Sequence, residues 1–304
     1  MSISAPAAPM PRPTLTSLDL GLYGATVFAW GFSWIVIKAQ IGDVAPEVSV
    51  FWRFVLAALA MFGWSWVRGH RMRYALKDHA KFLGLGVLIF STNFTLFYYG
   101  SAYLPSGLVA VVFSIASTFN ILLAFLLFAQ RPALNVVIAG GMGIFGIALM
   151  FWPEIMGTTL NANALKGLSL CGLGTLSFCL GNMVSAKAQG DGIAVIPASA
   201  WGMAYGAGFI GGFALLRGQS FEVPLDPLYL GSLVYLAVIA SVIAFGSYLT
   251  LLGRIGSAKA GYATVIFPVV ALAVSTVVES YQWSALAIAG VVLVLCGNVL
   301  MLRR

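Results

Sequence analysis

The chain has 304 residues, of which 61% are hydrophobic and only 8% are charged. A water-soluble domain carries roughly 25% charged residues, so this composition excludes one and indicates a protein that folds in lipid. A net charge of +7 would fit a nucleic-acid partner, but five of the 16 basic residues crowd one short loop between apolar segments, which the membrane orientation explains better, and we expect no such partner.

Ten apolar segments are long enough to cross a bilayer, which takes roughly 20 residues of helix. We place the first five at about Leu20–Ile37, Pro46–Val67, Phe82–Ser101, Ser106–Phe128 and Ala133–Phe151. We place the second five at about Leu165–Ala186, Pro197–Leu216, Tyr229–Leu252, Ala260–Val278 and Ala285–Leu302. The predicted fold is an all-α membrane protein with ten transmembrane helices.

Residues 1–19 precede the first span and are rich in Pro, Ala and Ser. The segment lacks the apolar core of a signal peptide, so we interpret it as a disordered cytoplasmic tail. Cys171, Cys179 and Cys296 lie inside predicted spans, and their odd number and spacing predict neither a disulfide framework nor a zinc site. We expect no metal and no cofactor.

The basic residues predict the orientation in the membrane. Five of them crowd the connection between the second and third spans: Arg68, Arg71, Arg73, Lys77 and Lys81. Positively charged loops stay in the cytoplasm. With that loop inside, twelve basic residues lie inside and three outside, and Arg53 lies within a span. We therefore expect both termini in the cytoplasm and a multi-pass protein of the plasma membrane, the inner membrane of a bacterium.

Short sequences recur at a separation of about 150 residues. Lys38-Ala39-Gln40 recurs as Lys187-Ala188-Gln189 at the end of the first span of each half. Ile138-Ala139-Gly140 similarly recurs as Ile288-Ala289-Gly290 in the last span of each half. These matches predict an internal repeat.

We interpret residues 20–151 and 165–302 as two five-helix repeats, joined by a linker at 152–164. Because each copy has an odd number of crossings, the second copy is inverted in the membrane relative to the first. Inverted repeats are typical of transporters that work by alternating access. One chain contains both halves, so we expect a functional monomer.

Four local motifs resemble those of a known family: Trp30-Gly31-Phe32, Arg53-Phe54, a Gly-rich fifth span and Phe267-Pro268. Together they resemble the drug/metabolite transporter (DMT) superfamily and its ten-helix EamA-type exporters, over about residues 20–302. The aromatic-rich spans are most similar to the YddG-type aromatic amino-acid exporters. The resemblance implies five spans in each half and the export of a small molecule.

The chain departs from that family at one position. The usual glutamate after the fourth span is missing, because Phe128-Ala129-Gln130-Arg131 stands there. Glu279 occupies the equivalent place in the second half. The departure weakens any shared mechanistic role for this acid.

None of the nine carboxylates lies deep in a predicted span, and His70 and His79 fall in the basic loop. Proton-driven carriers use a titratable group inside the bundle. We therefore expect export driven by the substrate's own gradient, with a proton-coupled multidrug or other metabolite exporter as the alternative. An intramembrane enzyme would need catalytic groups within mutual reach at membrane depth, and the sequence offers no such set.

Arg53 is the only cation well inside a predicted span, and an intramembrane charge is a functional candidate. We consider a gating or charge role for Arg53 and for Lys38. Alternatively, Arg53 reaches the outer interface or pairs with Glu47, and Lys38 is an interfacial anchor. With so few buried cations, we do not expect a phosphorylated substrate, because a phosphate group needs an arginine or lysine clamp.

Polar and aromatic side chains at membrane depth predict the binding site. Ser91 and Tyr98 share one face of the third span, with Asn93 close by, and Tyr248 repeats the arrangement in the eighth. Pro268 leaves a carbonyl of the preceding turn without its donor. Such a lining would suit an aromatic or hydrophobic amino acid. The alternatives are hydrogen bonds that only join helices and a purely structural kink. The candidate substrate-binding residues are Trp30, Ser33, Ser91, Asn93, Tyr98, Ser114, Asn182, Tyr248, Tyr262, Phe267 and Pro268.

Overall fold

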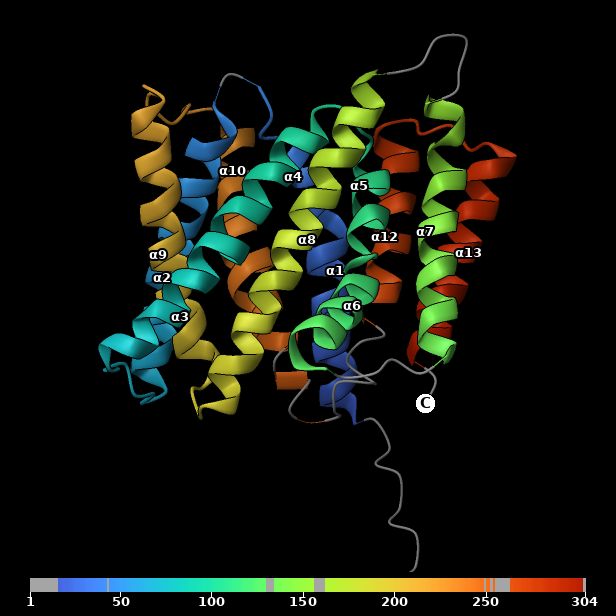
Figure 1. The fold of residues 1–304 in the computed structure, drawn as a ribbon. Helices are drawn as coiled ribbons and strands as arrows, with labels where there is room; N and C mark the ends of the chain where they lie inside the picture. The colour runs from blue at the N-terminus through green and yellow to red at the C-terminus, as the bar shows by residue number, and fades with distance from the viewer. Residues whose placement is uncertain are drawn as a thin grey trace, which may run out of the picture.

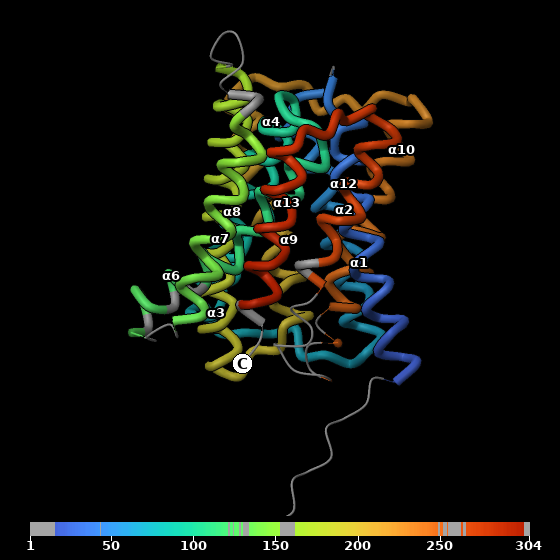
Figure 2. The backbone as a smooth tube through the Cα atoms, turned by 90° about the vertical axis from the view of Figure 1, so that its right-hand side faces the viewer, coloured from blue at the N-terminus to red at the C-terminus, as the bar shows by residue number. Residues whose placement is uncertain are grey.

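The computed structural model is built of helices alone in the residues that it describes (Figure 1), which are 16–42, 44–129, 134–155, 162–248, 250–251, 254 and 263–302. Helix α1 begins, and helix α13 ends, at the same end of the bundle, which is the lower one in Figures 1 and 2. We call this the lower end, and the opposite end, where α1 finishes, the upper end.

Most predicted spans correspond to one helix each. The first part of the chain forms α1 (Ser17–Lys38), α2 (Pro46–Val67), α3 (Leu76–Val87), α4 (Phe94–Ser101), α5 (Ser106–Phe113), α6 (Ala116–Phe128) and α7 (Leu134–Ile155). The second part forms α8 (Ala162–Gly190), α9 (Val195–Leu216), α10 (Pro227–Val234), α12 (Ala263–Val278) and α13 (Ala285–Leu302). Two π-helical segments complete the set, η1 (Leu88–Asn93) between α3 and α4 and η2 (Tyr235–Ile243) after α10.

Eight of the described helices, counting α3–η1–α4, α5–α6 and α10–η2 as one each, are long and apolar enough to cross a membrane. The last two are apolar over shorter stretches, Ile266–Val278 and Ala285–Leu300. The protein is thus a helical membrane protein, as predicted, whereas the count of ten spans stays a prediction.

The predicted tail lies mostly, and the predicted linker partly, outside the described residues. Of the tail, 1–19, residues 1–15 are not described, and residues 17–19 belong to α1, which therefore begins before the predicted Leu20. A capping box explains that start, since the Asp19 backbone N–H donates to Thr16 Oγ1 at 3.3 Å and Asp19 Oδ2 accepts from the Thr16 N–H at 2.9 Å. Of the linker, 152–164, residues 156–161 are not described.

The predicted span Ser106–Phe128 is interrupted, because α5 ends at Phe113 and α6 begins at Ala116. Ser114 Oγ donates to the carbonyl of Val111 at 2.6 Å, and Ser117 Oγ donates to the carbonyl of Ser114 at 3.0 Å. Such hydroxyl-to-backbone bonds compete with the helical ladder and favour a break. In contrast, α12 continues as a helix through Pro268.

Glycines allow two pairs of helices to approach closely. A Cβ atom at Gly206 of α9 would lie 2.9 Å from the carbonyl oxygen of Gly86 in α3. A Cβ atom at Gly290 of α13 would lie 2.4 Å from the carbonyl oxygen of Gly146 in α7. Larger side chains at these positions would force the backbones apart.

The helix contacts are mirrored between the two parts of the chain. α2 packs on α9, and α7 packs on α13, side by side in both views (Figures 1 and 2). α1 packs on α12 and η2, while α8 packs on α5 and η1. If the first five predicted spans are exchanged for the second five, the α2–α9 and α7–α13 contacts stay the same. The contacts of α1 become those of α8.

Candidate functional site

A cavity of about 420 Å³ lies inside the bundle. Small-molecule sites have volumes of roughly 300–1,000 Å³, so this one suits a single small metabolite. Its described lining comes from both parts of the chain: α1 to α6 with η1, and α8, α9, η2 and α12 with the helical turn that follows η2. The pair α7 and α13 lies outside that lining.

The described lining reaches the surface only toward the lower end. Ile37, Arg53 and Phe97 form its deep part and are buried. Ala186 and Gln189 line the cavity near the lower end of α8 and are exposed. Among the described residues, therefore, the cavity is closed above and accessible from below.

Aromatic rings form one wall around Trp30 of α1. The centroid of its ring system lies 5.4 Å from that of Phe245, 5.3 Å from that of Tyr248 and 6.1 Å from that of Phe267. The Trp30 Nε1–H donates to the carbonyl of Ala240 at 3.2 Å, which fixes the ring against η2. This wall therefore joins α1 to the second half of the chain.

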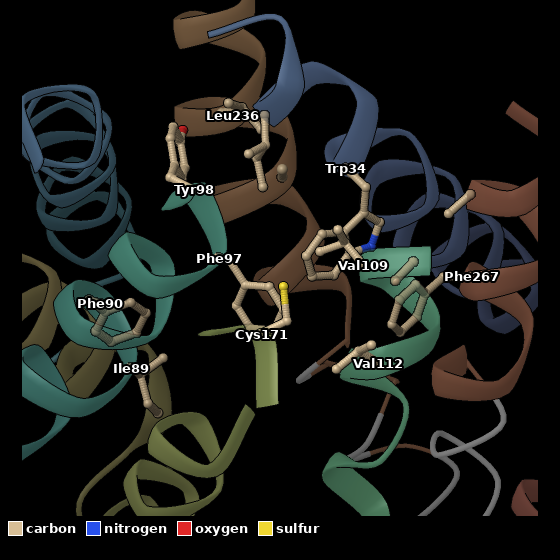
Figure 3. Close-up of a cluster of buried hydrophobic side chains, with 14 of the residues drawn as sticks. Trp34, Ile89, Phe90, Phe97, Tyr98, Val109, Val112, Cys171, Leu236 and Phe267 are labelled. Carbon is tan, nitrogen blue, oxygen red and sulfur yellow. The ribbon is translucent and has the colours of Figure 1, made fainter. Parts of the chain in front are cut away.

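A second aromatic wall surrounds Trp34, one turn along α1. Its ring lies 5.1 Å from that of Phe97 and 5.6 Å from that of Phe113, and Phe113 lies 4.8 Å from Phe178 of α8. Figure 3 shows Trp34, Phe97 and Phe267 on three different helices. Edge and tilted contacts of this kind stabilise the wall and leave aromatic surface facing the cavity, which suits an aromatic or apolar ligand.

Polar side chains near the α5–α6 break line another part of the cavity. Asn182 Nδ2 donates to Asn120 Oδ1 at 3.3 Å, and Ser117 Oγ lies 3.0 Å from Asn298 Oδ1. Ser33 Oγ donates to the carbonyl of Trp30 at 2.7 Å. An apolar pocket with a few fixed polar groups is typical of small-molecule recognition.

Arg53 is only 2% exposed and borders the cavity. Its Nε–H donates to Ser241 Oγ at 3.2 Å, and its guanidinium carbon lies 4.3 Å from the centre of the Phe94 ring. Glu47, the partner considered from the sequence, instead accepts from Arg217 Nη1 at 3.1 Å and from Tyr99 Oη at 2.7 Å. The charge of Arg53 is thus stabilised by a hydroxyl and an aromatic face.

Lys38 lies away from the cavity, at the upper end of α1. Its Nζ is 2.7 Å from Glu279 Oε1 and donates to the carbonyl of Leu104 at 3.0 Å. Glu279 Oε2 accepts from the Ser106 N–H at 2.8 Å, from the Ser106 hydroxyl and from Ser275 Oγ at 2.7 Å. We call Lys38, Glu279, Ser106 and Ser275 the upper-end latch, because they tie α1, α5 and α12 together above the cavity.

The predicted site residues divide into three groups. Those that line the cavity are Trp30, Ser33, Arg53, Asn93, Ser114, Asn182, Tyr248 and Phe267. Ser91, Tyr98 and Pro268 are buried but do not line it, and Tyr98 Oη donates to Gln40 Oε1 at 2.7 Å. Tyr262 lies outside the described residues.

Ser91 and Tyr98 lie on a different face of this helix from the residues that line the cavity. Leu85, Ile89, Asn93 and Phe97 line it and follow one another at intervals of four residues, as on one face of a regular helix. The spacing of Ser91 and Tyr98 predicted a shared face correctly, but that face packs inside the bundle. Which face borders the cavity is decided by the neighbouring helices.

Seven lining aromatic residues were not among the predicted site residues: Trp34, Phe90, Phe94, Phe97, Phe113, Phe178 and Phe245. Trp34 and Phe113 each left a signal in the sequence, since Trp34 follows Trp30 by one helical turn and Phe113 precedes Ser114. In a chain with 21 phenylalanines, Phe178 gave no such signal.

The sequence model of the EamA-like transporter family matches the chain twice, over residues 20–152 and 165–303. The chain belongs to the EamA-like transporter family. The predicted resemblance to EamA-type exporters of the DMT superfamily is thereby confirmed, and as an EamA-like transporter the protein is a multi-pass membrane protein that moves a small molecule.

Relatives of this EamA-like transporter cover nearly its whole length. It is 26% identical to the "Probable amino-acid metabolite efflux pump" of Escherichia coli (strain K12), over 91% of this chain and 93% of the relative. It is 25% identical to the "Uncharacterized transporter YoaV" of Bacillus subtilis (strain 168), over 93% and 96%. A solved crystal structure with 14% identity has the same fold, with a TM-score of 0.68 over 94% of this chain and 96% of that one.

Proposed function

We propose that this EamA-like transporter exports small amphipathic metabolites, in particular aromatic and hydrophobic amino acids, by alternating access. The observation that carries the proposal is the cavity between the two halves, whose walls are aromatic rings with a few fixed polar groups. The similarity to a protein named as a probable amino-acid metabolite efflux pump supports an amino-acid substrate.

The proposed architecture is ten transmembrane helices in two inverted five-helix repeats, residues 20–151 and 165–302. The double match of one family model and the mirrored helix contacts support it. Because α1 begins and α13 ends at the same end of the bundle, the arrangement is compatible with both termini in the cytoplasm (Figure 1).

In this proposal the described conformation faces the cytoplasm. The cavity is accessible from the lower end, which the basic loops assign to the cytoplasm, and the upper-end latch closes the other side. An exporter must load its substrate from the cytoplasm, so this conformation is the loading state. Lys38 then has a gating role through Glu279.

We further propose that the substrate's own gradient drives transport and that one chain suffices. Among the described residues that line the cavity, none is Asp, Glu or His. A proton-coupled carrier would need such a group to gain and lose a proton between states. One chain also supplies the whole described lining, which supports a functional monomer.

Flux of radiolabelled phenylalanine from proteoliposomes, measured with and without a pH gradient, tests this function. We expect flux down the phenylalanine gradient at a rate that the pH gradient leaves unchanged, and no flux from protein-free liposomes. Strict dependence on the pH gradient would contradict uniport. Absence of flux for phenylalanine, tryptophan and leucine under both conditions would contradict the amino-acid substrate.

A further inference from the structure

Three polar atoms on residues that line the cavity are buried and have no hydrogen-bond partner. They are Arg53 Nη1, Asn93 Oδ1 and Trp34 Nε1. A buried polar group without a partner is costly, and most such groups in proteins are satisfied. Because all three belong to residues that line the cavity, a polar ligand bound there is a candidate for the missing partner.

The guanidinium of Arg53 is held in one orientation. Phe94 lies against its face, with 4.3 Å from the guanidinium carbon to the ring centre, and Phe54 lies at 5.4 Å. The Ser241 hydroxyl accepts from Arg53 Nε–H and donates to the carbonyl of Leu236 at 2.8 Å, so this hydroxyl is also held in one orientation. A fixed guanidinium with an unused donor at Nη1 is suited to a carboxylate, which accepts charge-assisted hydrogen bonds.

Asn93 presents the opposite chemistry. Its Nδ2 donates to the carbonyl of Ile89 at 3.3 Å, which leaves Oδ1 as the unused acceptor. Asn93 directly precedes Phe94, the residue whose ring lies against Arg53. Both residues line the same cavity, so it has a cationic donor and a neutral acceptor among its walls.

We propose that Arg53 and Asn93 form a head-group site for a zwitterionic α-amino acid. Arg53 binds the carboxylate, Trp34 Nε1–H is a second donor to it, and Asn93 Oδ1 accepts from the ammonium group. The inference rests on the proposed function and narrows its substrate class. An amine without a carboxylate is repelled by Arg53, and a carboxylate without an ammonium leaves Asn93 unpaired.

Isothermal titration calorimetry of the purified full-length protein with three ligands that share one phenyl ring tests the site. The ligands are L-phenylalanine, phenethylamine, which lacks the carboxylate, and 3-phenylpropionate, which lacks the ammonium group. A hydrogen bond to a charged group contributes enough that we expect each analogue to bind the wild type roughly 10- to 100-fold more weakly than phenylalanine.

Two variants assign the two halves of the head group. Arg53→Gln is expected to make the affinity for phenylalanine equal to that for phenethylamine. Asn93→Leu is expected to make the affinity for phenylalanine equal to that for 3-phenylpropionate. Arg71→Gln is the matched control, because Arg71 is exposed in the connection between α2 and α3, and it is expected to keep wild-type selectivity. Arg53→Met, which also removes the charge but keeps an unbranched side chain, replaces Arg53→Gln if the latter does not fold.

The outcomes separate the head-group site from the proposed function. If the wild type binds phenylalanine and phenethylamine equally well, the head-group site is wrong while amphipathic transport stands. The head-group site would also be wrong if a folded Arg53 variant kept the wild-type preference for phenylalanine over phenethylamine. If the wild type binds none of the three ligands and moves no amino acid, the proposed function itself fails.

Discussion

Glu279 is the centre of the upper-end latch. Burial alone raises the pKa of its carboxyl group, but hydrogen bonds from Lys38, Ser106 and Ser275 outweigh that effect and leave the pKa below its ordinary value of 4.5. A group with a lowered pKa stabilises the closed latch when it is ionised. That stabilisation is present above the ordinary pKa of glutamate and is lost as the pH falls through the lowered pKa.

Replacing the carboxylate with an amide should therefore open the upper end. Glu279→Gln removes a charged acceptor shared by three side chains, and we expect it to shift the equilibrium toward the upper-open state by roughly 1–3 kcal/mol. The distance between spin labels at Ala39 and Gln282, both exposed at the upper end, measures the opening.

In the wild type this distance should lengthen only as the pH falls below about 4.5, the ordinary pKa, and in the variant it should not depend on pH there. Glu222→Gln is the control, because Glu222 is exposed in the connection between α9 and α10, and it should leave the distance unchanged. Equal distances in the wild type and in Glu279→Gln at neutral pH would contradict the role of the latch.

Phe178 tests the aromatic wall, because it lines the cavity and packs on Phe113 without being fully buried. Aromatic pairs contribute about 0.5–1.5 kcal/mol beyond simple burial. We expect Phe178→Leu to lower the preference for phenylalanine over leucine by about 2- to 10-fold in the flux assay. Phe209→Leu changes a ring on the exposed face of α9 and should leave the preference unchanged.

Among the elements, the long apolar helices could be predicted from the sequence, whereas their irregularities could not. Apolar runs separated by charged connections define a membrane span directly. The η1 segment and the break after Phe113 depend on hydrogen bonds within one turn, and nothing in the apolar pattern marks them. That Asn93, rather than Ser91, lines the cavity depends on how η1 packs on α8 and α9, which the apolar pattern does not specify either.

The packing of α3 on α9 depends on two facing glycines. A Cβ atom at Gly206 would lie 2.9 Å from Gly86 O and from the Phe90 side chain, so one of the helices must move. We expect Gly206→Ala to destabilise the protein by about 1–3 kcal/mol and to lower its apparent Tm in detergent. At Gly208, two residues further along α9, a Cβ atom would meet nothing within 4 Å. Gly208→Ala should therefore keep or raise the Tm, and equal losses in both variants would contradict the packing.

Across the whole molecule, the sequence predicted the repeat from short matches, but it could not place the cavity. The lining combines residues as distant as Trp30 and Phe267, and their contact depends on how α1 packs on α12. Similarly, the pairing of Lys38 with Glu279 joins the end of α1 to the end of α12. Contacts between residues so far apart in the sequence follow from helix packing, which the short-range periodicity of the sequence does not specify.

The central claim is that one cavity opens alternately to the two sides of the membrane, and locking the upper end tests it most directly. A short bifunctional thiol reagent can link Lys38→Cys to Glu279→Cys across the upper end, with each single variant as the control for the three native cysteines. After complete linkage we expect phenylalanine flux from proteoliposomes to stop while binding from the lower side persists, and a cleavable linker to restore flux. Undiminished flux through the fully linked protein would contradict alternating access.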